Sequence, residues 1–143
     1  MKRAIDITLQ TLHVGESRRV VTLGIDNEDP AFDFLSKLKI DDSNKYDSIE
    51  SRIKAISKYE HYENKITFRH VGDGIYEFKR PGVRLYAFYD EIEGLDHLIL
   101  CTNGGKKNKR QNSDIRKAKG IKKQYFLAKE LPDTTLHLKD LNE

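Results

Sequence analysis

The chain has 143 residues, close to the commonest size of a single domain and long enough to bury a hydrophobic core. Its single cysteine excludes an internal disulfide framework, and no run of residues approaches the ~18 apolar residues of a membrane span or the apolar core of a signal peptide. The formal net charge of +3 is modest, so the distribution of charge along the chain is more informative than the total. We therefore expect one domain over residues 1–143 in the reducing cytoplasm, with Cys101 packed as a small hydrophobic residue.

Residues 1–25 are predicted to form a β-hairpin. Ile5, Ile7 and Leu9 alternate with polar residues, and residues 20–23 are rich in β-branched side chains. Gly15 begins a short polar stretch that is typical of a turn between two strands. Residues 1–19 are accordingly expected to add a strand or an arm at the N-terminus.

Two amphipathic helices are predicted within residues 30–62. Asp29 can cap the first helix, and Pro30 suits its first position because the fixed φ of proline is already helical. Apolar residues then recur at helical spacing until Asp41, and Asp42 or Ser43 caps the second helix. The apolar stripe of the second helix comprises Tyr46, Ile49, Ile53 and Ile56. The two helices make a hairpin whose apolar face requires a sheet to cover it.

Short apolar runs after the helices are predicted to form strands. They cover residues 65–71, 75–80, 83–89 and 95–102, and turn residues separate them. Alternation places Arg84 on the same face as Tyr86 and Phe88. The run over residues 95–102 is apolar enough to be a central strand buried on both faces.

The segment that follows these strands is strongly basic. Residues 101–130 include ten lysine and arginine residues and two acidic ones, a net charge of +8, so the remainder of the chain is net acidic. A helix is expected to start at Asn112 or Ser113, and the tail over residues 131–143 has no periodicity, although its leucines leave pairing with a sheet edge open. Because the charges continue from the Gly104-Gly105 turn, a polyanion-binding face is favoured over an ordinary solvated helix.

These elements predict an α+β fold, in which a small antiparallel sheet of four or five strands carries the helical hairpin on one face and the basic helix at its edge. In this order, residues 20–130 resemble the RelE/HigB superfamily of bacterial and phage toxins, particularly its phage-derived HigB-like branch. The Arg84-Leu85-Tyr86 strand and the Gly105-Lys106-Lys107 sequence carry the resemblance, by their order and spacing after the two helices. The resemblance implies a RelE-like mRNA-cleaving toxin of a type II toxin–antitoxin pair, which acts on mRNA on or off the ribosome and is neutralised by a cognate antitoxin protein.

The candidate catalytic residues are cations. RNA can be cleaved without a metal when its 2′-hydroxyl attacks the adjacent phosphate, which requires a cation for the developing charge and groups that transfer two protons. Arg84 is the leading cation because its planar fork can grip two phosphate oxygens, and the alternative is an ion pair with Glu77 or Asp90. Lys107 lies where the RelE pattern carries a basic catalytic residue, and Lys79 on the neighbouring strand completes the expected set. The expected RNA-binding residues are Arg80, Lys106, Lys109, Arg110, Lys117 and Lys122, and no metal or cofactor is implied.

The sequence departs from the RelE pattern in two places. Relatives commonly carry a tyrosine or histidine shortly after the basic loop, whereas residues 109–113 contain neither, and Glu77 replaces a lysine typical of RelE strands. Proton transfer is therefore assigned to Glu77, Tyr86 or His97, unless catalysis is slow or the fold has another use. Two alternatives stay open: a non-catalytic inhibitor of DNA gyrase, as in the ParE branch, and a phage-derived protein that binds nucleic acid or a host protein.

Overall fold

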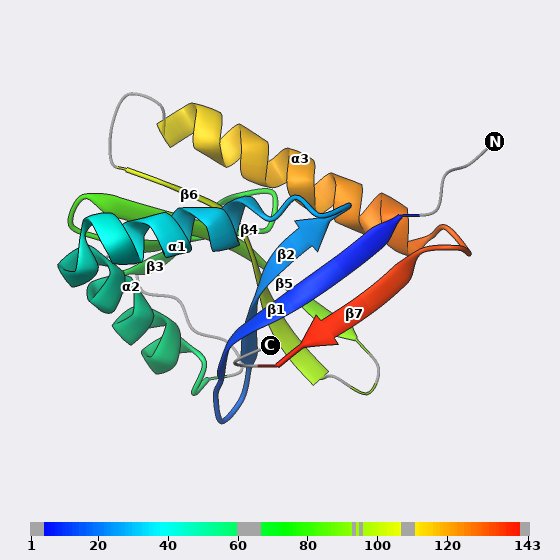
Figure 1. Cartoon of the computed structure of the whole chain (residues 1–143), viewed down its shortest axis with the longest axis horizontal. Helices are drawn as coiled ribbons and strands as arrows, with labels where there is room; N and C mark the ends of the chain where they lie inside the picture. Colours follow the sequence, from blue (N-terminus) through cyan, green and yellow to red (C-terminus); the bar gives the residue numbers. More distant parts are fainter. Residues whose placement is uncertain (1–4, 60–66, 93, 95, 107–110, 141–143) are drawn as a thin grey trace.

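A computed structural model describes residues 5–59, 67–92, 94, 96–106 and 111–140. Within these ranges the chain has an α+β fold of three helices and seven strands (Figure 1). The helices are α1 (Pro30–Asp41), α2 (Ser43–Ile56) and α3 (Gln111–Lys129). The strands are β1 (Asp6–Val14), β2 (Arg19–Ile25), β3 (Phe68–Gly72), β4 (Ile75–Arg80), β5 (Val83–Ile92), β6 (Asp96–Gly105) and β7 (Thr135–Lys139). No helix of the described chain combines the length and the apolar character needed to cross a membrane.

The strands form one mixed sheet in the order β3-β4-β5-β6-β2-β1-β7. β3 to β6 pair antiparallel, as predicted, whereas β2 pairs parallel to β6 and β7 parallel to β1. The prediction of four or five antiparallel strands is therefore wrong in number and in direction. The parallel pair β2–β6 needs a long crossover, and the chain between these strands supplies it with both helices and the β3–β5 meander.

The first and last described strands lie at the same side of the sheet. β1 and β2 form the predicted hairpin, with Leu9 opposite Leu23. β7 lies beside β1 with Leu136 opposite Ile7, so the tail pairs with an edge instead of remaining irregular. Leu136 and Leu138 pack against the core cluster under α3, and this burial stabilises a short strand that has no helical periodicity.

α1 and α2 begin where their caps are predicted. The Asp29 carboxylate accepts a hydrogen bond from the Phe32 amide at 3.0 Å, and Asp42 caps α2 in the same way. α2 ends well before residue 62, because the carbonyl of the next residue, Ser57, accepts hydrogen bonds from the turn between β1 and β2. Residues 60–62 of the predicted helix lie outside the described residues.

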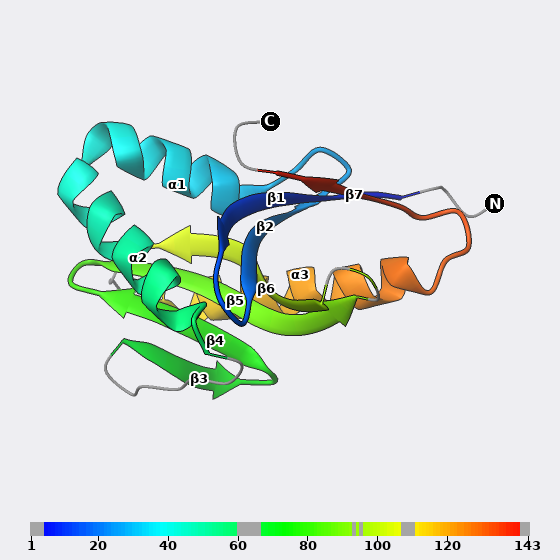
Figure 2. The same cartoon turned by 90° about the horizontal axis from the view of Figure 1, so that it is seen from below.

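Both faces of the sheet are covered by helices. α1 and α2 pack on one face, as predicted, whereas α3 packs on the opposite face rather than at the edge. In Figure 2, α2 lies in front of β4 and β5, and α3 lies behind them. The cause is the apolar character of the central strands: in β6, Ile99 and Cys101 face α1 and α2, while Leu98 and Leu100 face α3. Each of these apolar faces requires a cover.

Candidate nucleic-acid interface

Four side chains that the sequence proposes for catalysis lie together on the α3 face of β4 and β5. The cross-strand register places Lys79 opposite Arg84 and Glu77 opposite Tyr86. Residues two apart on a strand share a face, and residues directly opposite have Cβ atoms about 5 Å apart. The four side chains therefore form a compact group, which we call the β4–β5 square. It combines a lysine, an arginine, a carboxylate and a phenol.

Glu77 is the centre of a charge cluster. Its side chain is fully buried, with Oε1 3.1 Å from Arg69 Nε and Oε2 accepting a hydrogen bond from Gln111 Nε2 at 3.0 Å. Arg84 Nε lies 3.6 Å from the same Oε1. A buried carboxylate needs such partners, because an unpaired buried charge costs several kcal/mol. Glu77 thus links β4 to β3, to β5 and to the first residue of α3.

Arg84 is buried and engaged by the protein itself. Only 2% of the residue is exposed, and Nη1 donates to the carbonyls of Arg80 and Val83 at 2.7 and 2.8 Å. Its Nε is within ion-pair distance of Glu77, but 3.6 Å is too long for a hydrogen bond. This buried N–H has no hydrogen-bond acceptor among the described residues. The structure therefore contains the ion pair that was the alternative to a freely accessible phosphate-binding arginine.

Tyr86 presents a buried hydroxyl. The residue is fully buried, and its hydroxyl has no hydrogen-bond partner in the described part of the chain. Burial raises the pKa of Tyr86 above its usual value, and the carboxylates of Glu77 and Asp114 act in the same direction. The phenol consequently stays protonated at neutral pH. Such a group can donate a proton or a hydrogen bond, but it is unsuited to act as a general base.

Two other residues proposed from the sequence lie away from the square. His97 is near the start of β6, where its Nδ1 is 2.7 Å from Glu91 Oε1, at the opposite end of the β5–β6 pair from Arg84. Arg80 faces α2, where its Nε donates to Ser48 Oγ at 3.3 Å. Strand alternation places Arg80 on the sheet face away from the square. Neither residue is therefore in position to act with the buried group.

The lysines expected to bind RNA have different surroundings. Lys106 is exposed after β6 and lines a cavity of about 330 Å³ beside α1 and α2. Lys117 is exposed on α3, whereas Lys122 Nζ donates to the carbonyl of Asp73 at 2.6 Å and so fastens the turn between β3 and β4. The residues of the expected site that lie outside the described residues are Lys107, Lys109 and Arg110.

Sequence reasoning missed two members of the charge cluster. Arg69 and Gln111 both donate to Glu77, from β3 and from the start of α3. Arg69 pairs across the strands with Glu77, so a register for the predicted strand over residues 65–71 would have indicated it. No sequence pattern points to Gln111, because its contact depends on the face of the sheet on which α3 packs.

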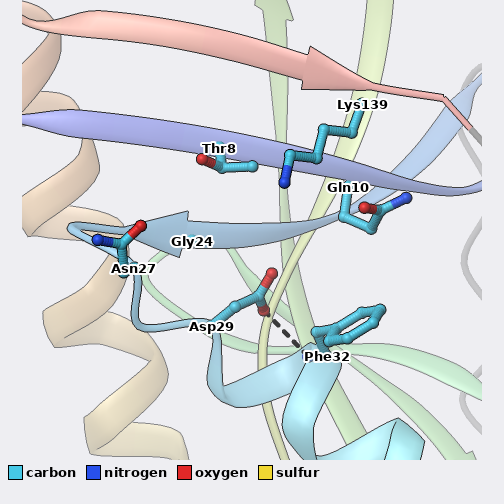
Figure 3. Close-up of a pocket in the computed structure, with 7 residues that line it drawn as sticks. All are labelled: Thr8, Gln10, Gly24, Asn27, Asp29, Phe32 and Lys139. Atoms are coloured by element: carbon cyan, nitrogen blue, oxygen red, sulfur yellow. Dashed lines mark hydrogen bonds between the residues drawn. The ribbon is translucent and has the colours of Figure 1, made fainter. Parts of the chain in front are cut away.

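A separate polar cavity of about 200 Å³ lies beside β1, β2 and β7 (Figure 3). Its lining includes Thr8 and Gln10 of β1, Asp29 before α1, Phe32 of α1 and Lys139 of β7. Burial raises the pKa of Asp29, although hydrogen bonds from Thr22 and Phe32 oppose the shift. None of the residues proposed for catalysis or RNA binding is among the described residues that line this cavity. Across the described ranges, no group of three or more His, Cys, Asp or Glu side chains could hold a metal ion.

Comparison with known proteins gives no match: no family model, no curated protein and no solved structure is significantly similar to the chain. The likeness to RelE/HigB toxins therefore stays a prediction, carried by residues 84–86, residues 105–107 and the order of the elements. A function for this protein must follow from the chemistry of the β4–β5 square and its surroundings.

Proposed function

We propose that this protein is the toxin of a type II toxin–antitoxin pair and that it cleaves mRNA in the cytoplasm, free or on the ribosome, without a metal. The observation that carries the proposal is the β4–β5 square, which gathers Arg84, Glu77 and Tyr86 on one face. Cleavage through the 2′-hydroxyl needs a cation, a proton acceptor and a proton donor. The square holds residues suited to all three roles.

In the proposed reaction, the RNA 2′-oxygen attacks the adjacent phosphorus. Glu77 accepts the proton of the 2′-hydroxyl while the O2′–P bond forms and the P–O5′ bond breaks. Tyr86 donates its phenolic proton to the leaving O5′, so the products are a 2′,3′-cyclic phosphate and a 5′-hydroxyl. Glu77 lies directly opposite Tyr86 and can return the proton to it. Arg84 and Lys79 stabilise the negative charge that develops on the phosphorane.

Two buried donors support an anionic ligand at this place. Arg84 Nε–H and Tyr86 O–H have no acceptor among the described residues, and they lie two positions apart on one face of β5. Proteins pair nearly all of their buried polar groups, and exceptions call for a specific cause such as a catalytic role or a bound ion. A phosphate supplies acceptor oxygens for both donors. Since Gln111 occupies one oxygen of Glu77, substrate binding in this proposal displaces the Gln111 side chain.

The burial of Arg84 favours a second candidate function. The guanidinium is held by Glu77 and by two backbone carbonyls, as expected of a group that stabilises the fold. If that is its whole role, the protein is a non-catalytic binder: a ParE-type inhibitor of DNA gyrase or a phage-derived nucleic-acid-binding protein. Its contact surface would then be the exposed basic side chains of α3, such as Lys117, rather than the square.

A toxin of this kind requires a protein partner. An acidic, partly disordered chain that folds across the basic surface is the simplest way to block it. Induction of the protein alone should arrest bacterial growth, and co-expression of an acidic open reading frame from the same locus should restore it. Normal growth after induction of the folded protein would contradict both the toxin and the antitoxin proposals.

Mapping RNA 5′ ends after induction in bacteria separates the two candidate functions. The nuclease proposal expects new 5′-hydroxyl ends within mRNA. Double-strand DNA breaks without new RNA ends would identify the gyrase alternative instead. The absence of both would leave nucleic-acid or host-protein binding as the function and would refute cleavage.

Purified variants test the assignment of Glu77. Glu77→Gln removes the proton acceptor, so single-turnover cleavage of a short RNA should slow by a factor on the order of 10² while RNA affinity changes little. Glu91→Gln is the matched control, because Glu91 is an exposed carboxylate of β5 that pairs with His97 away from the square. Thermal melting confirms that each variant is folded. Equal rates for both variants would remove Glu77 from the mechanism.

A further inference from the structure

The cavity that Lys106 lines lies at the same end of the sheet as the β4–β5 square, but on the other face. Arg84 is opposite Gly105 in the register, so β5 begins where β6 ends. A Cβ atom on Gly105 would meet the Asp114 side chain of α3, whereas one on Gly104 would meet the Phe34 ring of α1. The Phe34 side chain of α1 therefore covers one face of the end of β6, and the Asp114 side chain of α3 covers the other.

The floor of this cavity is apolar and partly aromatic. It includes Phe34, which is partly buried, and Leu38, which is 5% exposed. The Phe34 ring lies against the backbone of Gly104, where any side chain would overlap it. Aromatic rings of this kind stack on unpaired bases without strong sequence preference. The volume of about 330 Å³ is within the range of small-ligand sites.

The rim of the cavity is predominantly cationic. Three lysines from three elements line it, Lys37 of α1, Lys45 of α2 and Lys106 after β6. Lys45 Nζ is 3.5 Å from Asp42, whose other carboxylate oxygen caps α2. Lys37 and Lys106 have no ion-pair partner within the described part of the chain and stay available to an anion. Asp41 and Asp42 also line the cavity, so three lysines face two carboxylates and the rim has a small net positive charge together with hydrogen-bond acceptors.

Arg80 is a further cation on the same face of the sheet. Its Nε donates to Ser48 of α2, one turn after Lys45. The aliphatic part of Lys45 packs beside Gly82, in the turn that follows Arg80. Arg80 therefore lies near Lys45 on this face of the sheet, although it is not among the described residues that line the cavity.

We propose that this cavity binds one unpaired nucleotide of single-stranded RNA, with the base on Phe34 and the phosphate between Lys37 and Lys106. The inference rests on the proposed function in that RNA is the ligand, and it adds a nucleotide subsite that the square does not contain. The scissile phosphate lies on the α3 face, and a neighbouring nucleotide occupies the cavity on the α1 face. The Asp41 carboxylate accepts a hydrogen bond from the amino group of cytosine or adenine.

Binding of a fluorescent oligocytidylate to the full chain tests the subsite. Lys37→Ala should raise Kd by about tenfold and lower the salt slope by about 0.7, since one phosphate contact is lost. Lys54→Ala is the matched control, because Lys54 is an exposed lysine of α2 that pairs with Glu50 outside the cavity. With 5-iodocytidine in the RNA, photo-crosslinking should modify Phe34. Lys37 is exposed and has no ion-pair partner among the described residues, so its replacement should not disturb folding.

The outcomes distinguish this inference from the proposed function. Crosslinking at Phe34 without RNA cleavage would support the subsite and refute the nuclease. The subsite alone would be overturned if the protein cleaves RNA but the Lys37→Ala variant binds oligocytidylate as tightly as Lys54→Ala does and the crosslinks fall outside Phe34. Failure of the wild-type chain to bind oligocytidylate would also overturn the subsite. The nuclease proposal would then still be tested separately, by cleavage of cellular mRNA.

Discussion

Replacing Tyr86 by phenylalanine tests whether its buried hydroxyl is kept for function rather than stability. The hydroxyl is desolvated and has no partner among the described residues, and such a group costs about 1–3 kcal/mol. Tyr86→Phe removes that cost and retains the ring that packs under α3. We expect the free energy of unfolding to rise by about 1 kcal/mol, which corresponds to an increase in Tm of about 3 °C for a domain of this size.

Tyr125→Phe is the matched control on the same face of the sheet. Tyr125 is also fully buried, but its hydroxyl donates to Asp90 Oδ2 at 2.6 Å. A hydrogen bond to a charged group contributes about 1.5–3 kcal/mol, so Tyr125→Phe should lower the free energy of unfolding by that amount. Lys129 remains 2.7 Å from the same oxygen and limits the loss. The two substitutions delete the same atom and should change stability in opposite directions.

Urea denaturation followed by circular dichroism measures both changes, provided that the m-value stays constant. If Tyr86→Phe destabilises the protein as much as Tyr125→Phe, the Tyr86 hydroxyl has a partner and the reasoning is wrong. The same variant bears on catalysis, because the proposed mechanism uses this proton for the leaving O5′. Tyr86→Phe should therefore combine higher stability with cleavage slowed on the order of 10². Unchanged cleavage would remove Tyr86 from the proposed reaction.

Three further substitutions test local features. Gly104→Ala places a methyl group against the Phe34 ring and should destabilise the protein by about 1–3 kcal/mol in thermal melting, whereas a neutral result would mean that α1 shifts freely. A methyl group added at Gly120 of α3 would have no described atom within 4 Å, so Gly120→Ala should stabilise the protein by about 1 kcal/mol, and a loss of stability would contradict this. Burial raises the pKa of Asp29 above its usual 3.8, so its contribution to stability is present below that pH and is lost as pH rises through the folded-state pKa. Asp29→Asn keeps the helix cap and should abolish this pH-dependent loss of stability. In urea denaturation at pH 7 the variant should therefore be at least as stable as the wild type, and a decrease of more than about 1 kcal/mol in the free energy of unfolding would contradict this.

The local elements of this fold were predictable because their causes lie within a few residues of one another. Asp29 and Asp42 act as caps through bonds to amides three residues later. The alternation in β4 and β5 places Glu77 with Lys79, and Arg84 with Tyr86, once the turn at Pro81-Gly82 is recognised. The spacing of side chains along a strand or helix is set by its backbone geometry, so the face that carries the apolar residues can be identified from the sequence.

The sequence by itself determined the two helices, the antiparallel meander, the basic segment and the side chains that share a face on β5. Tertiary structure alone decided that β2 pairs parallel to β6, that β7 joins the sheet and that α3 covers the second face. It also decided that Arg69 and Gln111 converge on Glu77, and that Arg84, the proposed phosphate-binding arginine, is buried within ion-pair distance of the same carboxylate. These features depend on contacts between residues far apart in the chain. A local pattern predicts that a face is buried, but it does not predict which element packs on that face.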